Sequence, residues 1–365
     1  MRTELCERFG IEYPIFAFTP SEHVAAAVSR AGGLGVLGAV RFNDPAELDR
    51  TLDWLDDNTD GKPYGVDVVM PMKMPTEGKA VDLQAMIPPE HITFVERTLQ
   101  QLGVPPLPEG QGRDGVLGWL HSVARSHVDI ALAHRPVLIA NALGSPPKDV
   151  IDQAHEAGVQ VAALAGAAKH ALSHVANGVD IIIAQGYEAG GHTGEIASMV
   201  LTPEIVDAVG PDVAVLGAGG IGRGRQVAAS LALGAQGVWT GSVWLTTEEY
   251  QNLNTNAGMT EAFLRASSSD TVRTRVYTGK PARLLRTKWT EAWEAEDAPS
   301  PLPMPLQNLL VSDAHSRMNS AGNPDVISMP VGQIVGSMNK VRPVAEVMAD
   351  LIAEYEETVK RLSSL

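Results

Sequence analysis

The chain has 365 residues, and 28 basic against 43 acidic side chains give a formal net charge of −15. Nucleic acids and anionic membrane surfaces attract clustered positive charge, so this balance argues against both as main partners. Hydrophobic residues make up 44% of the chain and charged residues 19%, which permits a large core and excludes general disorder. At about 150 residues per domain, the length predicts roughly two domains or one large barrel with insertions.

The cysteine content and the first residues indicate a cytoplasmic protein. Cys6 is the single cysteine, which excludes a disulfide framework and a cysteine-based zinc site. Residues 1–8 lack the apolar run of a signal peptide. Residues 226–247 contain no acidic or basic side chain and are long enough to span a bilayer, but glycines interrupt them. A buried helix followed by a buried strand explains this stretch better, so we expect no membrane partner.

Short apolar runs alternate with helix-like segments along the chain. The runs are nearly continuous, as in parallel strands that helices cover on both sides. They occupy residues 14–16, 33–40, 64–70, 137–142, 159–164, 179–184, 213–216 and 237–240. The segments predicted to be helices between them are 21–31, 45–55, 147–157, 167–177 and 223–233. Eight such strands favour an α/β fold of the (β/α)8 TIM-barrel type, with a doubly wound open sheet as the alternative.

Two stretches are too long to be simple connections in a barrel. One covers about residues 72–134, between the third and fourth strands, and the other covers about 246–330. Each is expected to be an insertion with its own helices, and such insertions often form lids. A last amphipathic helix at about 341–362 is predicted to pack back on the barrel. The predicted organisation is a barrel over 1–245, a helical lid segment over 246–330 and a C-terminal helix within 331–365.

The densest glycine cluster contains the spacing G-x-G-x-x-G at Gly217, Gly219 and Gly222. Between a strand and a helix, this spacing has the form of a dinucleotide-binding loop. That interpretation needs an acidic residue about 20 positions later, at the end of the next strand. The next strand ends without one, and the first acid after it is Glu248. The dinucleotide interpretation is therefore the weaker one.

A barrel explains the same glycines as a phosphate site. The loops after the seventh and eighth strands of a barrel commonly present backbone N–H groups to a phosphate at a helix N-terminus. Here these loops are residues 217–224 and 240–242. The alternative is that the glycines only permit tight turns. Two such loops in the correct order favour phosphate binding.

The second glycine-rich cluster, residues 184–194, has the sequence AQGYEAGGHTG and follows a buried run. It therefore lies at the carboxyl end of the sixth strand, on the active face of a barrel. Glycines on both sides leave His192 accessible to a ligand, and its unperturbed pKa of about 6.5 suits proton transfer. We favour this role over a structural histidine. The other histidines lack a metal-ligand pattern, so no metal site is expected.

This cluster resembles the AQGxEAGGHxG signature of the nitronate monooxygenase family, formerly called 2-nitropropane dioxygenases. Further segments that are similar to the family lie at 31–35, 217–221, 237–242, 281–286 and 332–336. The resemblance covers most of the chain apart from about 72–134. It implies an FMN-dependent TIM barrel with a smaller lid domain, in which the flavin supplies the electron chemistry and the protein supplies orientation.

The resemblance also implies roles for single residues. His192 matches the histidine that serves as catalytic base or substrate-orienting group beside the flavin. Asp67 stands where the family has a flavin-contacting asparagine, and a carboxylate accepts hydrogen bonds but donates none unless it is protonated. The loop at 14–21 is shorter than is usual in the family. The implied FMN contacts are Asp67, Gln185 and Gly190, with Gly220, Trp239, Thr240, Gly241 and Ser242 as the phosphate cradle.

Three functions remain open at this point. The first is oxidation of alkyl nitronates with O2, in which His192 orients the substrate or takes a proton from a neutral nitroalkane. The second is an NAD(P)H-dependent flavin reductase that acts on a quinone or an enoyl thioester, with His192 as proton donor. The third is a barrel that binds a phosphorylated ligand without turnover. A small-molecule substrate is the expected partner in the first two, and the sequence leaves open whether the chain forms a homodimer.

Overall fold

The computed structural model describes residues 1–70, 83–107, 121–253 and 256–365. Within these residues, eight parallel strands form a closed barrel in the order β1-β2-β3-β4-β5-β6-β8-β9, and β9 pairs with β1 to close it. The predicted TIM barrel is therefore confirmed. Its strands are β1 (Ile15–Thr19), β2 (Leu34–Gly38), β3 (Tyr64–Val68), β4 (Leu138–Asn141), β5 (Gln160–Ala165), β6 (Ile181–Gln185), β8 (Ala214–Ala218) and β9 (Gly237–Thr240).

Helices surround the barrel because alternate residues of each strand face outward. On β3, Val66 and Val68 pack in the outer core together with Leu48 and Leu52 of a covering helix. The opposite face of the strands fills the interior of the barrel. The covering helices are α2 (Glu22–Arg30), α3 (Pro45–Asn58), α5 (His121–Ala133), α6 (Lys148–Glu156), α7 (Ala168–Ala176), α8 (Ser198–Val209) and α9 (Gly224–Ala232).

A short N-terminal helix, α1 (Glu4–Phe9), covers one end of the barrel interior. Its Leu5, Cys6 and Phe9 are buried in one core with the inward-facing Phe16 and Leu34 of the first two strands. These strands run away from this end, so the carboxyl ends of all eight strands meet at the opposite end. Barrel enzymes place their active sites at that carboxyl end.

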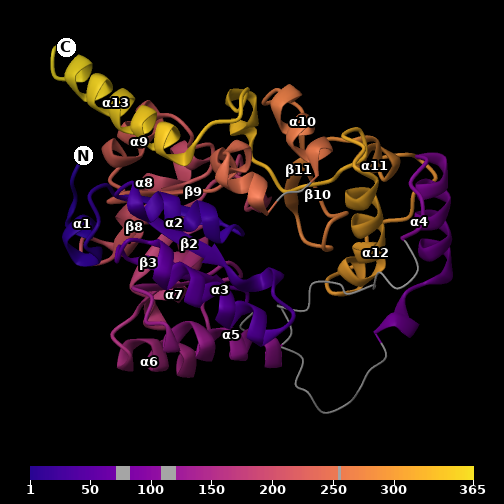
Figure 1. The fold of residues 1–365 in the computed structure, drawn as a ribbon, viewed down its shortest axis with the longest axis horizontal. Helices are drawn as coiled ribbons and strands as arrows, with labels where there is room; N and C mark the ends of the chain where they lie inside the picture. Colours follow the sequence, from indigo (N-terminus) through magenta and orange to yellow (C-terminus); the bar gives the residue numbers. More distant parts are fainter. Residues whose placement is uncertain (71–82, 108–120, 254–255) are drawn as a thin grey trace.

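The carboxyl end is covered by a lid built from two distant parts of the chain. The lid contains α4 (Pro89–Gln101), α11 (Lys288–Ala292) and α12 (Leu306–Ala321), which lie together at the right of Figure 1. The rings of Phe94 and Trp293 lie 4.7 Å apart, and both belong to one buried core. The helix α5, by contrast, packs on α3 and β3 as a barrel helix. Residues 72–82 and 108–120 of the predicted first insertion lie outside the described residues.

A small second sheet connects the lid with the barrel. It has the order β10-β11-β7 and consists of β10 (Thr271–Thr274), β11 (Ala282–Leu285) and β7 (Gly191–His192). In its antiparallel register Ala282 lies opposite His192. A further helix, α10 (Ala257–Arg265), precedes this sheet. The glycine-rich segment after the sixth strand is therefore held by a strand that lies about ninety residues later in the chain.

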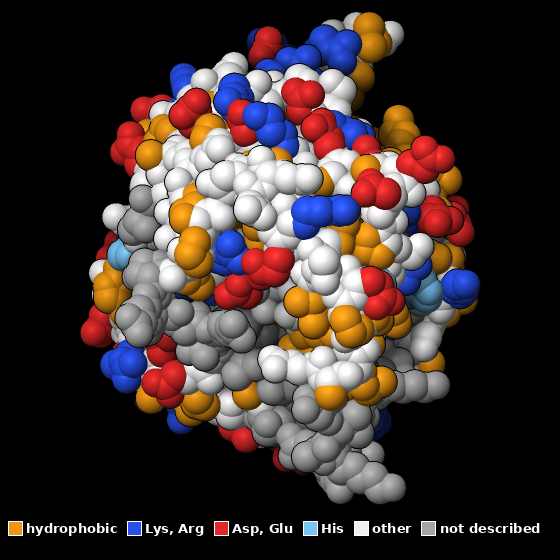
Figure 2. All heavy atoms as spheres, turned by 90° about the vertical axis from the view of Figure 1, so that its right-hand side faces the viewer, with side chains coloured by type: hydrophobic (Ala, Val, Ile, Leu, Met, Phe, Trp, Pro, Cys, Tyr) orange, Lys and Arg blue, Asp and Glu red, His pale blue; other side chains and the backbone are white. Residues whose placement is uncertain are grey.

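The last helix, α13 (Val344–Leu362), packs on α9 and α2, and its C-terminal end projects from the barrel in Figure 1. It begins after Pro343, three residues later than the sequence pattern predicts. On the lid side of the molecule, acidic and basic side chains are interspersed with hydrophobic ones (Figure 2). No helix within the described residues has the length and apolar character that a membrane span requires.

Candidate active site

A single cavity of about 370 Å³ lies at the carboxyl ends of the barrel strands, beneath the lid. Its walls come from the barrel, from the loops after β6, β8 and β9, and from lid residues. Every residue to which the resemblance assigns a role lines this cavity. These residues are His192, Asp67, Gln185, Gly190, Gly220, Trp239, Thr240, Gly241 and Ser242.

His192 lies at the junction of the barrel and the lid. Its Nε2 atom is 2.7 Å from the Oγ1 atom of Thr278, a lid residue, while Nδ1 bonds to no described residue. Burial, together with a smaller effect of the positive charge of Lys280, lowers the pKa of His192 to about 4. The imidazole is therefore neutral at pH 7. Its pKa lies below the unperturbed value of about 6.5 on which the sequence-based expectation rested.

Asp67 points into the barrel from β3. Only 2% of the residue is exposed, and its carboxyl group forms no hydrogen bond with any described residue. Burial raises the pKa of this carboxyl well above its usual range. A second polar side chain in the cavity is that of Gln185, whose Nε2 atom donates a long hydrogen bond of 3.5 Å to the carbonyl of Gly190. The two groups are therefore available to a ligand.

The loop after β8 has the properties of an anion site. Gly219 and Gly220 have φ values of +99° and +68°, in the left-handed region that glycine adopts without strain. The backbone N–H groups of Gly220 and Ile221 donate to no acceptor in the described part of the chain. Consecutive free N–H groups in such a turn form a concave surface that binds anions.

The loop after β9 completes this site. The Oγ atom of Ser242 accepts a 2.8 Å hydrogen bond from the N–H of Gly332, so its own proton remains available to a ligand. Thr240 differs, because its hydroxyl donates to the carbonyl of Phe16 and accepts from the indole of Trp244. Trp239 faces the cavity and stacks on Phe18 with ring centres 6.3 Å apart. Thr240 thus holds the loop, whereas Ser242 is free to bind.

The close fit of Gly190 explains why the loop that carries His192 is glycine-rich. A Cβ atom at Gly190 would lie 2.7 Å from the backbone N of Gly332, a distance that real Cβ contacts essentially never show. The same loop is anchored by Arg283 of β11, which donates to the carbonyl of Tyr187 at 3.2 and 3.1 Å. Glycine at position 190 therefore allows this loop and the segment around Gly332 to meet at the cavity.

Sequence reasoning missed the lid residues of the site. Tyr277, Thr278, Met304 and Asn308 line the cavity from the side opposite the barrel. The sequence pointed to this region, because the family-like segment 281–286 begins three residues after Thr278. The sequence pattern does not indicate, however, that this segment pairs with the strand that carries His192. Phe18 and Thr19 at the end of β1, within the segment 14–21 that was predicted to be a loop, also contribute to the wall, as does Pro20 after them.

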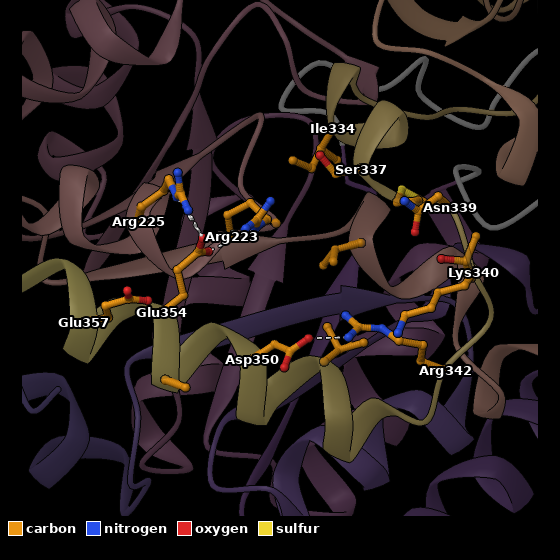
Figure 3. Close-up of a pocket in the computed structure, with 16 residues that line it drawn as sticks. Arg223, Arg225, Ile334, Ser337, Asn339, Lys340, Arg342, Asp350, Glu354 and Glu357 are labelled. Carbon is orange, nitrogen blue, oxygen red and sulfur yellow. Dashed lines mark hydrogen bonds and ion pairs between the residues drawn. The ribbon is translucent and has the colours of Figure 1, made fainter.

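A second cavity, of about 570 Å³, lies between α9, α13 and the loop before α13 (Figure 3). Arg223 and Arg225 both form ion pairs with Glu354, and Arg342 pairs with Asp350 across the same space. None of the predicted site residues lines it. Its charged groups mainly bind one another and tie the last helix to the barrel.

A TIM barrel with a half-buried histidine and two loops suited to an anion at its carboxyl end has the architecture of a barrel enzyme. Comparison with known proteins identifies the family. The family model described as nitronate monooxygenase matches residues 2–354. The chain belongs to this family, and it is a flavin-dependent oxidoreductase that acts on a small-molecule substrate.

Relatives and solved structures agree with this assignment. A Mycobacterium tuberculosis protein that carries the name of a monooxygenase is 51% identical, over 100% of this chain and 99% of the relative. A Staphylococcus aureus protein that carries the name of a nitronate monooxygenase is 28% identical, over 98% and 99%. The structure of nitroalkane oxidase from Streptomyces ansochromogenes has a TM-score of 0.80 and 26% identity, over 98% and 99%. FabK from Thermotoga maritima has a TM-score of 0.74 and 27% identity, over 100% and 99%.

Proposed function

We propose that the protein binds FMN and oxidises alkyl nitronates with O2, with His192 as the residue that orients the substrate. The observation that carries this proposal is a largely apolar cavity lined by His192, with the exposed Lys280 close enough for its charge to act on the imidazole. A nitronate is an anion with an alkyl chain. Its negative charge matches the positive charge of Lys280, and its alkyl chain matches the apolar walls of the cavity. The likeness to nitroalkane oxidase and to the nitronate monooxygenase of Staphylococcus aureus supports the same substrate class.

The described residues fit FMN as the flavin. A planar ring suits the apolar walls that Phe18, Trp239 and Leu164 contribute, and the buried Asp67 and Gln185 supply polar contacts for its edge. The phosphate suits Ser242 and the free N–H groups of the loop after β8, because charged acceptors gain most from such donors. When bound, the flavin supplies the electron transfer, which no side chain in the cavity provides.

His192 acts through hydrogen bonds in this proposal. A histidine with a pKa of about 4 is neutral at pH 7 and is a poor general base toward a neutral nitroalkane. Its Nε2 atom is occupied by Thr278, so Nδ1 is the atom that remains for the substrate. Which of the two nitrogens carries the proton follows from the direction of the Thr278 hydroxyl. We assign His192 to substrate orientation and leave proton abstraction outside its role.

Lys280 supplies the positive charge that an anionic substrate requires. Its backbone N–H donates a long hydrogen bond of 3.4 Å to Thr278, the residue that contacts His192. The ammonium group forms no ion pair with a described residue and is close enough to lower the pKa of His192. In a protein with a net charge of −15, this local cation favours approach of an anion to the cavity.

The alternative is an NAD(P)H-dependent reductase in which His192 donates a proton to a quinone or an enoyl thioester. The likeness to FabK keeps this alternative in view. It requires a protonated imidazole near pH 7, and the low pKa of His192 weighs against it.

Anaerobic mixing separates the two functions. The FMN-loaded protein is mixed with an alkyl nitronate, NADH or NADPH in separate experiments, and loss of flavin absorbance is followed. Rapid bleaching by the nitronate alone, followed by recovery of absorbance on addition of O2, is the expected result. Bleaching by NADH or NADPH without bleaching by the nitronate would replace the proposal with the reductase. A protein that takes up no FMN would overturn both.

A further inference from the structure

The third strand of the barrel carries a carboxyl group that has no partner among the described residues. Asp67 is 2% exposed and lines the cavity, yet no described residue forms a hydrogen bond or an ion pair with its side chain. The strands on either side, β2 and β4, contain no ionisable residue. The other ionisable groups among the described cavity residues are His192 and Tyr277.

An ionised carboxylate is unfavourable in this place. Moving a charge from water into an apolar environment is strongly disfavoured unless a cation or several donors compensate, and a carboxyl group responds by keeping its proton. Burial raises the pKa of Asp67, and no positive charge among the described residues acts against it. His192 supplies none, because its imidazole is neutral at pH 7.

A protonated carboxylic acid offers one O–H donor and one carbonyl acceptor. An amide side chain offers the same two functions in nearly the same shape, whereas a carboxylate offers acceptors alone. A protonated Asp67 can therefore bind a ligand through the same hydrogen-bond donor and acceptor as an asparagine.

We propose that Asp67 is a neutral carboxylic acid at pH 7 and donates a hydrogen bond to the bound flavin, so that flavin binding retains one proton on this side chain. This inference rests on the proposed function, because it requires the flavin to occupy the cavity. It goes beyond the proposed function, because it requires the affinity for flavin to depend on pH through the protonation of Asp67.

The linkage has a defined sign. If the complex holds the Asp67 proton more tightly than the free protein does, the dissociation constant rises once the pH exceeds the pKa of the free protein. The increase is up to tenfold for each pH unit, until the pKa of the complex is reached. Asp67→Asn has the same donor and acceptor without ionisation, so its flavin affinity is expected to be independent of pH over the same range.

The test compares the wild type, Asp67→Asn and the control Asp212→Asn, which changes an exposed carboxyl between α8 and β8. Dissociation constants for FMN are measured by quenching of its fluorescence at intervals from pH 6 to pH 9. The expected result is weaker binding at high pH for the wild type and for Asp212→Asn, with a flat profile for Asp67→Asn. Parallel profiles for all three proteins would overturn the proposal. So would an Asp67→Asn variant that fails to fold, because an amide replaces a neutral acid without loss.

A second measurement needs no flavin. A buried neutral acid keeps its proton in the folded state while the unfolded chain loses its proton above a pKa of about 3.9, so it lowers stability as the pH rises. The Tm of cofactor-free Asp67→Asn is therefore expected to exceed that of the wild type by a margin that grows between pH 4 and pH 8. A margin that stays constant would show an ionised Asp67 and would overturn the inference even if FMN binds. If the margin grows and the wild type takes up no FMN, the proposed function and the donation to flavin both fail.

Discussion

The imidazole of His192 and the hydroxyl of Thr278 are joined by a 2.7 Å hydrogen bond that connects the barrel to the lid. His192 belongs to β7, and Thr278 lies in the turn between β10 and β11, the strand that pairs with β7. The orientation of His192 therefore depends on correct docking of a segment 86 residues away in the chain.

Thr278→Val is expected to reduce kcat/KM for a nitronate by about fivefold, which corresponds to about 1 kcal/mol for one lost hydrogen bond. Valine has nearly the shape of threonine and cannot bond to Nε2, so the ring of His192 loses its restraint. Thr278→Ser keeps the hydroxyl and is expected to retain most of the activity. Full activity in Thr278→Val would show that the hydrogen bond does not restrain the ring.

The pH dependence of nitronate oxidation follows from the low pKa of His192. Because the folded-state value is about 4, the imidazole stays neutral from pH 6 to pH 8, and its protonation affects kcat/KM only toward pH 4. Lys280→Gln removes a charge that lowers this pKa, so the acid limb of the profile is expected to move to higher pH. Comparing the two proteins on one substrate cancels the titration of the nitronate itself. An unshifted limb would mean that Lys280 does not act on His192.

The barrel was predictable from the chain because its strands are nearly continuous apolar runs. Inward and outward positions are both buried, so residues such as Val66, Ile182 and Leu216 identify their strands without any alternation. The glycine-rich signature then indicated which end of the barrel is functional. The predicted site residues converge on one cavity because parallel strands bring their carboxyl ends together.

The lid and its contact with His192 were not predictable by the same means. A strand of two residues, Gly191–His192, is too short to show any periodicity, and its partner β11 lies far along the chain. The lid core likewise joins Phe94 to Trp293, and no local pattern relates such distant residues. The pKa values of His192 and Asp67 depend on this packing, so the sequence could suggest only the unperturbed value for His192 and none for Asp67.

Glu354 is expected to stabilise the attachment of α13 to α9, and Glu354→Gln is expected to lower the free energy of unfolding by about 1 kcal/mol. The carboxylate is 13% exposed and binds Arg223 and Arg225, which are half-exposed, so solvent screening limits the effect (Figure 3). Burial acts to raise the pKa of Glu354, but the hydrogen bonds and charges of the two arginines outweigh it and lower the pKa.

The lowered pKa makes this contribution depend on pH. It is present above the pKa of the unfolded chain and disappears as the pH falls through the lower folded-state value. Urea unfolding at pH 7 and at pH 3 therefore measures it, with the loss in Glu354→Gln confined to pH 7. Glu357→Gln is the matched control, because Glu357 lines the same cavity and forms no ion pair with a described residue. Equal effects of the two substitutions would contradict a specific role for Glu354.

His134 is expected to stabilise the packing of α5 on α3 at acidic pH. Its Nδ1 atom lies 2.7 Å from Asp56 and its Nε2 atom 3.0 Å from Asp49, so both ring nitrogens face carboxylates. Burial acts to lower the pKa of His134, but the hydrogen bonds and charges of Asp56 and Asp49 outweigh it and raise the pKa. A raised folded-state pKa gives a contribution to stability that is full below the unfolded value of about 6.5 and is lost as the pH rises through the folded value.

His134→Gln is expected to lower the free energy of unfolding by about 1 kcal/mol at pH 5.5 and by less at pH 8.5. The effect is limited because both carboxylates are partly exposed. Urea unfolding at the two pH values measures the difference, with the exposed His170→Gln as control. A loss for His134→Gln that is larger at pH 8.5 than at pH 5.5 would reverse the sign and refute this charge-pair account.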